Sequence, residues 1–350
     1  MISETASGPA PAVSVLIPVY NTAKHLSRGI FSLFTQQGIA WDDLEIIIIN
    51  DGSKDRTGEI ADAYVAKYPS IVRVVHQENG GHGEGINQGL IHATGKYFKV
   101  VDSDDVVSAD FPAFLDKLEE CDRNGGIDLM VTNYFYVHTD GVGDRSICYK
   151  SVLPTGKIFG WKDTKRFRIH QMLTIHSCTF RTELMRETAI EPLPKHVFYE
   201  DNLMICRVLH AVERMYYMNI DLYRYWIGRP DQSVQEEIMK KRYTHQLMVT
   251  ERCFKTCRLD EIKSPMLKKY LKHEFFVMFG ISVLYARLNK SDEADATLDK
   301  MWQGCFEHDE KWGKHFRYRT PLALICLPGK FGRSFGVFIY RLANKVVRFN

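Results

Sequence analysis

The sequence predicts an α/β fold: a doubly wound, mostly parallel sheet with helices on both faces, followed by a mainly helical C-terminal region. Two observations predict the sheet. Strand-like runs alternate with amphipathic segments in the first part of the chain, and the run at 44–49 is apolar almost throughout, which is typical of a strand covered on both faces. From about Ser233, Met, Leu, Phe and Tyr recur at helical spacing, which predicts the second region.

The individual elements follow from local patterns. Strands are predicted at 13–19, 44–49, 71–75 and 97–101. A helix is expected after each of the first three strands: one after the capping pair Asn21-Thr22, one around 60–65, and a short one from about Ile86. Helices are also expected at 243–257 and 266–288, where most apolar side chains should form core.

Composition limits the class of protein. The net charge of +3 argues against a whole-chain polyanion binder, so no nucleic-acid partner is expected. The eight scattered cysteines, including Cys253 and Cys257, complete no zinc pattern and fit a reducing cytoplasm. We expect residues 1–12 to form a disordered leader rather than a signal peptide, and no apolar run reaches the ~18 residues of a membrane span.

The C-terminal tail, about 321–350, has a different charge pattern. No acidic residue follows Glu310, whereas nine Lys and Arg do. A helical wheel from Phe331 groups apolar residues on one face, with basic residues away from it or at its edge. Such a basic amphipathic helix suits an anionic membrane surface, which would place the protein peripherally on the inner face of the membrane. Packing on its own domain, or on a second copy in a homo-oligomer, explains the pattern equally well.

A cluster of carboxylates follows the fourth predicted strand. Asp102, Asp104 and Asp105 surround the small Ser103, and such oxygens repel one another unless a cation lies among them. Mg²⁺ or Mn²⁺ is the expected ion, and it would hold a nucleotide diphosphate and neutralise a departing phosphate.

Polar residues also follow the other predicted strands: Tyr20 and Asn21, then Asp51, then Asn79. In open α/β sheets ligands bind beyond the carboxyl ends of the strands, so these residues predict one site together with the acidic cluster. The Gly-rich segment 80–85 does not match GxGxxG, and 89–97 departs from a P-loop in spacing and in its last residue. The sequence therefore supports neither a dinucleotide fold nor a P-loop ATPase.

These residues resemble a known family. The blocks VSVLIPVYN (13–21), INDGSKDRT (49–57), NGGHGEGIN (79–87) and DSD (102–104) are similar, in order and spacing, to those of inverting family 2 glycosyltransferases of the GT-A fold, of the type that builds bacterial cell-surface glycans. A fifth block, YED (199–201), resembles the acceptor-side motif. The resemblance implies a nucleotide-sugar-binding half at 13–115, an acceptor-binding half at 116–232 and a helical region at 233–350.

The resemblance also implies roles for single residues. Tyr20 would stack on the base, Asp51 would accept a hydrogen bond from it, Asp102 would contact the ribose or the metal region, and Asp104 would be the main metal ligand. Arg224 could pair with the diphosphate, His82 is either a donor contact or a loop residue, and His176 is either a metal or acceptor contact or a structural residue. The remaining donor-site expectations are Pro18, Asn21, Asn79, Asn87 and Ser103.

Asp201 is the expected general base. Inverting transfer is a single displacement in which the acceptor hydroxyl must lose a proton, and a carboxylate within reach can take it. Glu200 and Asp201 could equally cap the helix expected near Asn202, and the two roles are compatible.

The expected reaction moves a sugar, most simply from a UDP-sugar, to a hydroxyl of a glycan or lipid-linked acceptor. The segment Leu222–Trp226 matches the Gln-x-x-Arg-Trp motif of processive members only in part, which favours transfer of one or a few sugars. The alternatives are a non-catalytic nucleotide-sugar-binding homologue and a nucleotidyltransferase. The latter would need a basic Gly-rich loop after the first strand, where this chain has Pro18-Val-Tyr-Asn21.

Overall fold

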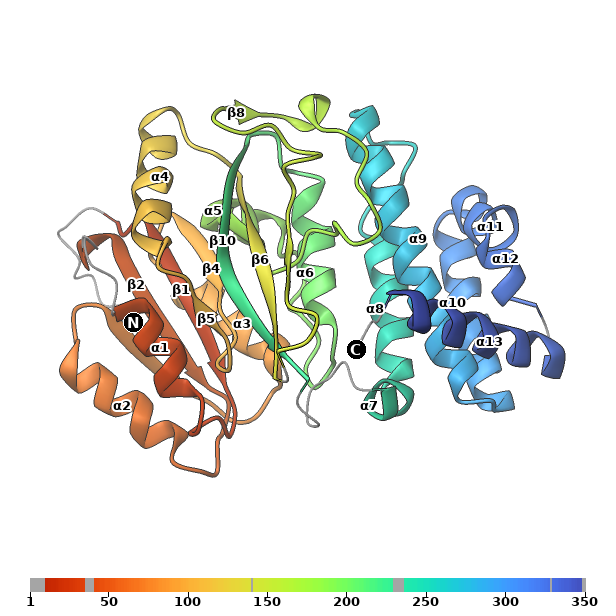
Figure 1. The fold of residues 1–350 in the computed structure, drawn as a ribbon, viewed down its shortest axis with the longest axis horizontal. Helices are drawn as coiled ribbons and strands as arrows, with labels where there is room; N and C mark the ends of the chain where they lie inside the picture. The colour runs from red at the N-terminus through yellow and green to blue at the C-terminus, as the bar shows by residue number, and fades with distance from the viewer. Residues whose placement is uncertain (1–9, 35–40, 140, 229–235, 328, 348–350) are drawn as a thin grey trace.

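The computed structural model describes residues 10–34, 41–139, 141–228, 236–327 and 329–347. A curled sheet carries helices on both faces, and a bundle of helices lies beside it (Figure 1). This confirms the predicted fold class. The expected leader falls mostly outside the described residues, as do Ser233 and the last residues of the tail.

The sheet has the order β3-β2-β1-β4-β9-β6-β10-β5, with β7 paired to β6 and β8 to β10. The long pairings are parallel: β1 with β2 and β4, β2 with β3, and β6 with β10. β9 runs antiparallel between β4 and β6 and so joins two parallel halves. The strands are β1 (Val13–Val19), β2 (Leu44–Asn50), β3 (Val72–His76), β4 (Tyr97–Val100), β5 (Val106–Val107), β6 (Leu129–His138), β7 (Arg145–Ile147), β8 (Ile158–Phe159), β9 (Cys178–Arg181) and β10 (Met215–Ile227).

Burial explains why the first strands are so apolar. Every residue of β1 and β2 is buried, as a parallel strand covered on both faces requires. The helices around the sheet are α1 (Leu26–Phe34), α2 (Thr57–Lys67), α3 (His82–His92), α4 (Phe111–Arg123), α5 (Thr182–Thr188) and α6 (Glu200–Leu209), with 3₁₀ turns η1 (Trp41–Asp43) and η2 (Trp161–Asp163). The four predicted strands agree with β1 to β4 within a residue at each end.

Helix α3 begins earlier than predicted. The expected start was about Ile86, but the helix begins at His82 and contains three glycines. A Cβ at Gly85 would lie 3.1 Å from Pro18 Cβ, and one at Gly89 would lie 2.4 Å from Leu16 Cδ1. These glycines therefore let α3 pack directly on β1, and packing repays their low helix propensity.

The C-terminal region is a bundle around α9. Tyr270 of α9 packs on η2 through Trp161, with ring centroids 5.4 Å apart, and on Phe167 at 4.8 Å, which ties the bundle to the sheet domain. Within the described residues, no helix is long and apolar enough to cross a membrane. The helices are α7 (Glu236–Lys241), α8 (Tyr243–Lys255), α9 (Pro265–Leu288), α10 (Asp292–His308), α11 (Glu310–Arg319), α12 (Leu322–Ile325) and α13 (Gly329–Val347).

Helix α13 packs on its own chain through only part of the face predicted from the helical wheel: Ile339 is half-buried against the core, whereas phenylalanine rings of that face point outward. Gly336 and Val337 are buried against the bundle, and Arg333 pairs with Asp292 and Asp295 of α10. Phe331 and Phe338, expected on the packed or membrane face, are 73% and 59% exposed. Gly336 has no side chain, so α13 can lie close to α9. The ion pairs of Arg333 fix the rotation of α13 about its axis, and the rings of Phe331 and Phe338 therefore face outward.

Candidate active site

The residues after β1 connect neighbouring loops. Tyr20 is 49% exposed, so its ring face is free for stacking. Asn21 adopts a left-handed backbone (φ 52°); its N–H donates to Ser53 Oγ (3.0 Å), and its Oδ1 accepts from the Lys54 N–H (2.7 Å). Asn21 therefore fixes the β1 loop against the β2 loop. Pro18 is buried under Gly85 of α3.

Asp51 holds the Gly-rich loop. Its carboxylate accepts from the backbone N–H groups of Gly80 (2.7 Å) and Gly81 (2.8 Å) and from Gln77 Nε2 (2.7 Å). Asn79 Nδ2 donates to the Asp51 carbonyl (3.0 Å). Both carboxylate oxygens already accept hydrogen bonds from this loop, so the structure gives Asp51 a positioning role, and its contact with the base stays a prediction.

Asn87 makes a similar connection deeper in α3. Its Oδ1 accepts from the Leu193 N–H (2.9 Å), and its Nδ2 donates to the Leu193 carbonyl (3.0 Å). Asn87 therefore fixes α3 to the segment that leads into α6, and the structure places this amide against protein rather than at the acidic cluster.

His82 links the donor-side and acceptor-side motifs. Its Nε2 lies 3.0 Å from Asp102 Oδ1, and its Nδ1 lies 2.7 Å from Glu200 Oε1. Burial opposes a charge on His82, but the hydrogen bonds to the two carboxylates outweigh it and raise the pKa of His82 well above its usual value. The same contacts lower the pKa of Asp102 against the opposing effect of burial. A charged imidazole therefore bridges two carboxylates.

Asp201 lies beside this bridge. Helix α6 begins at Glu200, directly after Tyr199, which has a left-handed backbone (φ 71°). Asn202 Nδ2 donates to Asp201 Oδ1 (3.2 Å). Burial, followed by the charge of Glu200, raises the pKa of Asp201 to about 7. A carboxylate with that pKa is suited to accept a proton near neutral pH.

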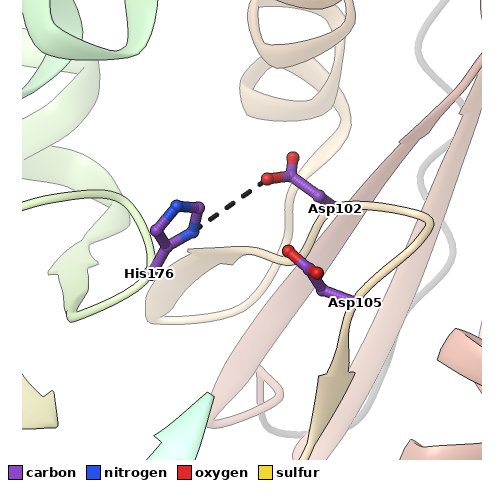
Figure 2. A group of neighbouring side chains, drawn as sticks. All are labelled: Asp102, Asp105 and His176. Atoms are coloured by element: carbon purple, nitrogen blue, oxygen red, sulfur yellow. Dashed lines mark ion pairs between the residues drawn. The ribbon is translucent and has the colours of Figure 1, made fainter. Parts of the chain in front are cut away.

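Asp102, Asp105 and His176 form the group in the described residues whose ligand atoms lie within 4.8 Å of one another (Figure 2). His176 Nδ1 is 4.0 Å from Asp102 Oδ2. Burial lowers the pKa of His176 to about 4, so the ring is neutral. Among the residues that the structure describes, this buried Nδ1 has no hydrogen-bond partner. A neutral imidazole nitrogen without a partner, beside a carboxylate, fits a divalent cation.

Asp105 is held by donors from β10 on both of its oxygens. Tyr223 Oη donates to Oδ2 (2.7 Å), and the Trp226 N–H donates to Oδ1 (2.9 Å). Burial and the neighbouring Asp104 raise its pKa well above the usual value. Asp105 therefore anchors β10 under the acidic loop. Asp104, the predicted main ligand, is not in this compact group, and its carbonyl accepts from Arg28 Nη2 (2.7 Å).

The structure does not bring Arg224 to this group. Tyr223 and Tyr225 contact the His176 ring, with centroids 4.7 and 4.5 Å away. Because side chains alternate along a strand, Arg224 projects from the opposite face, where its guanidinium lies 5.7 Å from the centre of the Phe135 ring. The predicted pairing of Arg224 with the diphosphate therefore has no support from its position. Ser103 is buried in the turn between the aspartates.

Lys99 was missed by the sequence reasoning. This fully buried lysine of β4 donates to the His176 carbonyl (3.2 Å), and burial lowers its pKa to about 8. It thus supports the loop that carries His176. A lysine inside an otherwise apolar strand, three residues before the acidic cluster, was the available signal.

Comparison with known proteins agrees with this geometry. Residues 14–182 match the family described as Glycosyl transferase family 2. The chain is 32% identical over 257 residues to the putative glycosyltransferase EpsH of Bacillus subtilis, covering 69% of this chain and 67% of EpsH. It is 37% identical over 131 residues to the glycosyltransferase GlyG of Streptococcus pneumoniae, covering 37% of this chain and only 41% of GlyG.

Solved structures show the same fold. TarS 1–349 of S. aureus, in complex with UDP-GlcNAc, has a TM-score of 0.67 at 19% identity, covering 96% of this chain and 91% of that chain. The mannosyltransferase PcManGT of Pyrobaculum calidifontis, in complex with GDP-Man and Mn²⁺, has a TM-score of 0.54 at 16% identity, covering 92% and 88%. The fold is that of the GT-A glycosyltransferases. The chain belongs to glycosyltransferase family 2.

Proposed function

We propose that this protein transfers a sugar from a nucleotide-sugar donor, in the first instance a UDP-sugar, to a hydroxyl of a cell-envelope glycan or lipid-linked acceptor, with inversion. The observation that supports the proposal is the connection Asp102–His82–Glu200, because it joins the donor-side acidic loop to the start of α6, where Asp201 follows Glu200. A module that only bound nucleotide sugars would have no need of a carboxylate with a pKa near 7 at this position.

The reaction is a single displacement. The acceptor oxygen forms a bond to the anomeric carbon as the bond from that carbon to the phosphate oxygen breaks, and the nucleoside diphosphate leaves with the electron pair. Asp201 takes the hydroxyl proton, and the charged His82 keeps Glu200 and Asp102 from repelling one another. Tyr20 offers its exposed ring to the base. A divalent cation, Mn²⁺ or Mg²⁺, would be held by Asp102 and His176 of the compact group, with Asp104 of the same loop as the further ligand that the family resemblance implies, and it would neutralise the leaving diphosphate.

Replacing the base tests this proposal. Asp201→Asn keeps the shape of the side chain but cannot accept the proton, so we expect kcat to fall by about 10²–10⁴-fold with donor affinity nearly unchanged. The matched control is Asp42→Asn, an exposed aspartate of η1, which should keep wild-type turnover. In the wild type kcat/KM should rise with pH through about 7, because the carboxylate is the active form. Unchanged turnover in Asp201→Asn would remove the assignment.

A further inference from the structure

A large basic cavity lies outside the active site, between the sheet domain and the helical bundle. Its volume is about 650 Å³, and its walls come from the segment after η2, the first half of α9 and the end of α11. No acidic residue lines it, whereas six basic side chains do: Lys165, Arg166, Lys268, Lys269, Lys272 and Arg319. The net charge of +3 for the whole chain conceals this local concentration.

Most of these charges have no acidic partner. Lys268 pairs with Asp260 (2.9 Å), and Lys272 lies over the Trp312 ring, 4.4 Å from its centre. For the other four, the described residues supply no carboxylate within ion-pair distance. Like charges held together cost free energy unless an anion joins them, so the cavity is suited to a negatively charged ligand.

Two histidines in the wall respond to the same positive surroundings. Burial, followed by Lys272 and Arg319, lowers the pKa of His315. Burial lowers the pKa of His273, and the charge of Arg166 lowers it further. A hydrogen bond to the Arg168 carbonyl acts in the opposite direction but does not outweigh them. Both rings are therefore neutral near pH 7 and add no charge to the wall. His273 already donates its Nε2–H to the Arg168 carbonyl, whereas the neutral His315 ring can donate one hydrogen bond to an anion.

The basic lining continues along the chain. Residues 165–167 line the large cavity, and 168, 170 and 171 line a second hollow of about 420 Å³ that also contains Lys150. The same segment leads on to His176 at the acidic group. Two hollows joined by one basic segment suit an extended anion better than a single ion.

The aromatic residues in the cavity wall narrow the class of ligand. Phe167, Tyr270 and Phe316 are all at least 95% buried, and Phe276 is half-buried. The wall thus presents its basic side chains more than its Phe and Tyr rings, which favours an anionic chain over a bilayer or a stack of nucleobases. We propose that this cavity, with the hollow beside it, binds a polyanionic, phosphate-bearing glycan chain, and that it docks the acceptor; the docking role rests on the proposed transferase function.

The test is calorimetric titration of the full-length chain with a linear oligophosphate of about ten phosphates, in chelator, so that no metal in the acidic group holds phosphate. Lys269→Gln/Lys272→Gln should weaken binding by about tenfold or more, because two charges in the wall are lost. The matched control, Lys67→Gln/Lys300→Gln, removes two exposed lysines elsewhere and should bind as the wild type does. Raising the salt concentration should weaken wild-type binding.

The proposal is wrong if the control pair loses as much oligophosphate affinity as the cavity variant, or if orthophosphate competes for the cavity as strongly as the oligophosphate does. It is also wrong if the cavity variant loses affinity only for anionic vesicles or only for single-stranded RNA. The readout is independent of catalysis. Oligophosphate binding should persist in Asp201→Asn, and nucleotide binding should persist in the cavity variant. Failure of the docking site is thereby distinguished from failure of the transferase assignment.

Discussion

At the scale of single residues, side chains of the family motifs form hydrogen bonds that fix the loops around the candidate active site. Asp51 accepts from the backbone N–H groups of Gly80 and Gly81, and Asn87 bonds to the backbone of Leu193, so each side chain supplies a partner to backbone groups outside regular structure. The sequence could indicate that these side chains gather at one edge of the sheet. It could not indicate which of their hydrogen bonds go to protein, because the partners lie up to about a hundred residues away.

His82 gives the sharpest prediction at this scale. Its positive charge lowers the pKa of Asp201, against the larger effect of burial. In His82→Gln that charge is gone, so the pKa of Asp201 should rise and the acid limb of the kcat/KM profile should move to higher pH. Activity should therefore fall more at pH 6.5 than at pH 8.5. His92→Gln, at the other end of α3, is the control, and an identical apparent pKa in both variants would contradict the role of His82.

At the scale of elements, periodicity located most helices well and described two of them incompletely. For α3 the glycines suggested a loop, because the propensity rule does not include the close packing on β1 that makes them favourable. For α13 the wheel identified the apolar face, but Arg333 and its aspartate partners on α10 determine which face is buried. Both errors come from tertiary contacts that a local pattern does not contain.

The outward rings of α13 lead to a test of membrane association. Phe331 and Phe335 stack at 6.3 Å, and Phe338 is exposed one turn further on. If this surface inserts into an anionic bilayer, Phe331→Ser/Phe338→Ser should reduce partition onto phosphatidylglycerol vesicles by about tenfold or more. Ile190→Ser, which removes a 91% exposed apolar side chain elsewhere, should have no effect. Equal sedimentation of all three proteins with vesicles would show that α13 does not dock there.

At the scale of the whole molecule, the sheet brings side chains that are far apart in the sequence together at the candidate active site. His82, Asp102, His176 and Asp201 come from four separate segments and meet through β4, β9 and the start of α6. The strand-end positions and the family resemblance predict that Asp102 and Asp201 belong to one site, whereas His82 and His176 each had a structural alternative. The roles of Lys99 and Asp105 and the basic cavity between the sheet domain and the bundle depend on three-dimensional packing, so the sequence alone did not reveal them.

The proposed mechanism requires a divalent cation at the acidic loop to hold the nucleotide diphosphate. Calorimetric binding of UDP, GDP, CDP and dTDP, each with Mn²⁺, with Mg²⁺ and with chelator, tests this requirement. We predict that one nucleotide binds only with metal, that Asp104→Ala abolishes this binding, and that His176→Ala weakens it by about tenfold or more. The control Asp42→Ala should bind normally. Nucleotide binding that is equal in chelator and unaffected by both site variants would contradict the account.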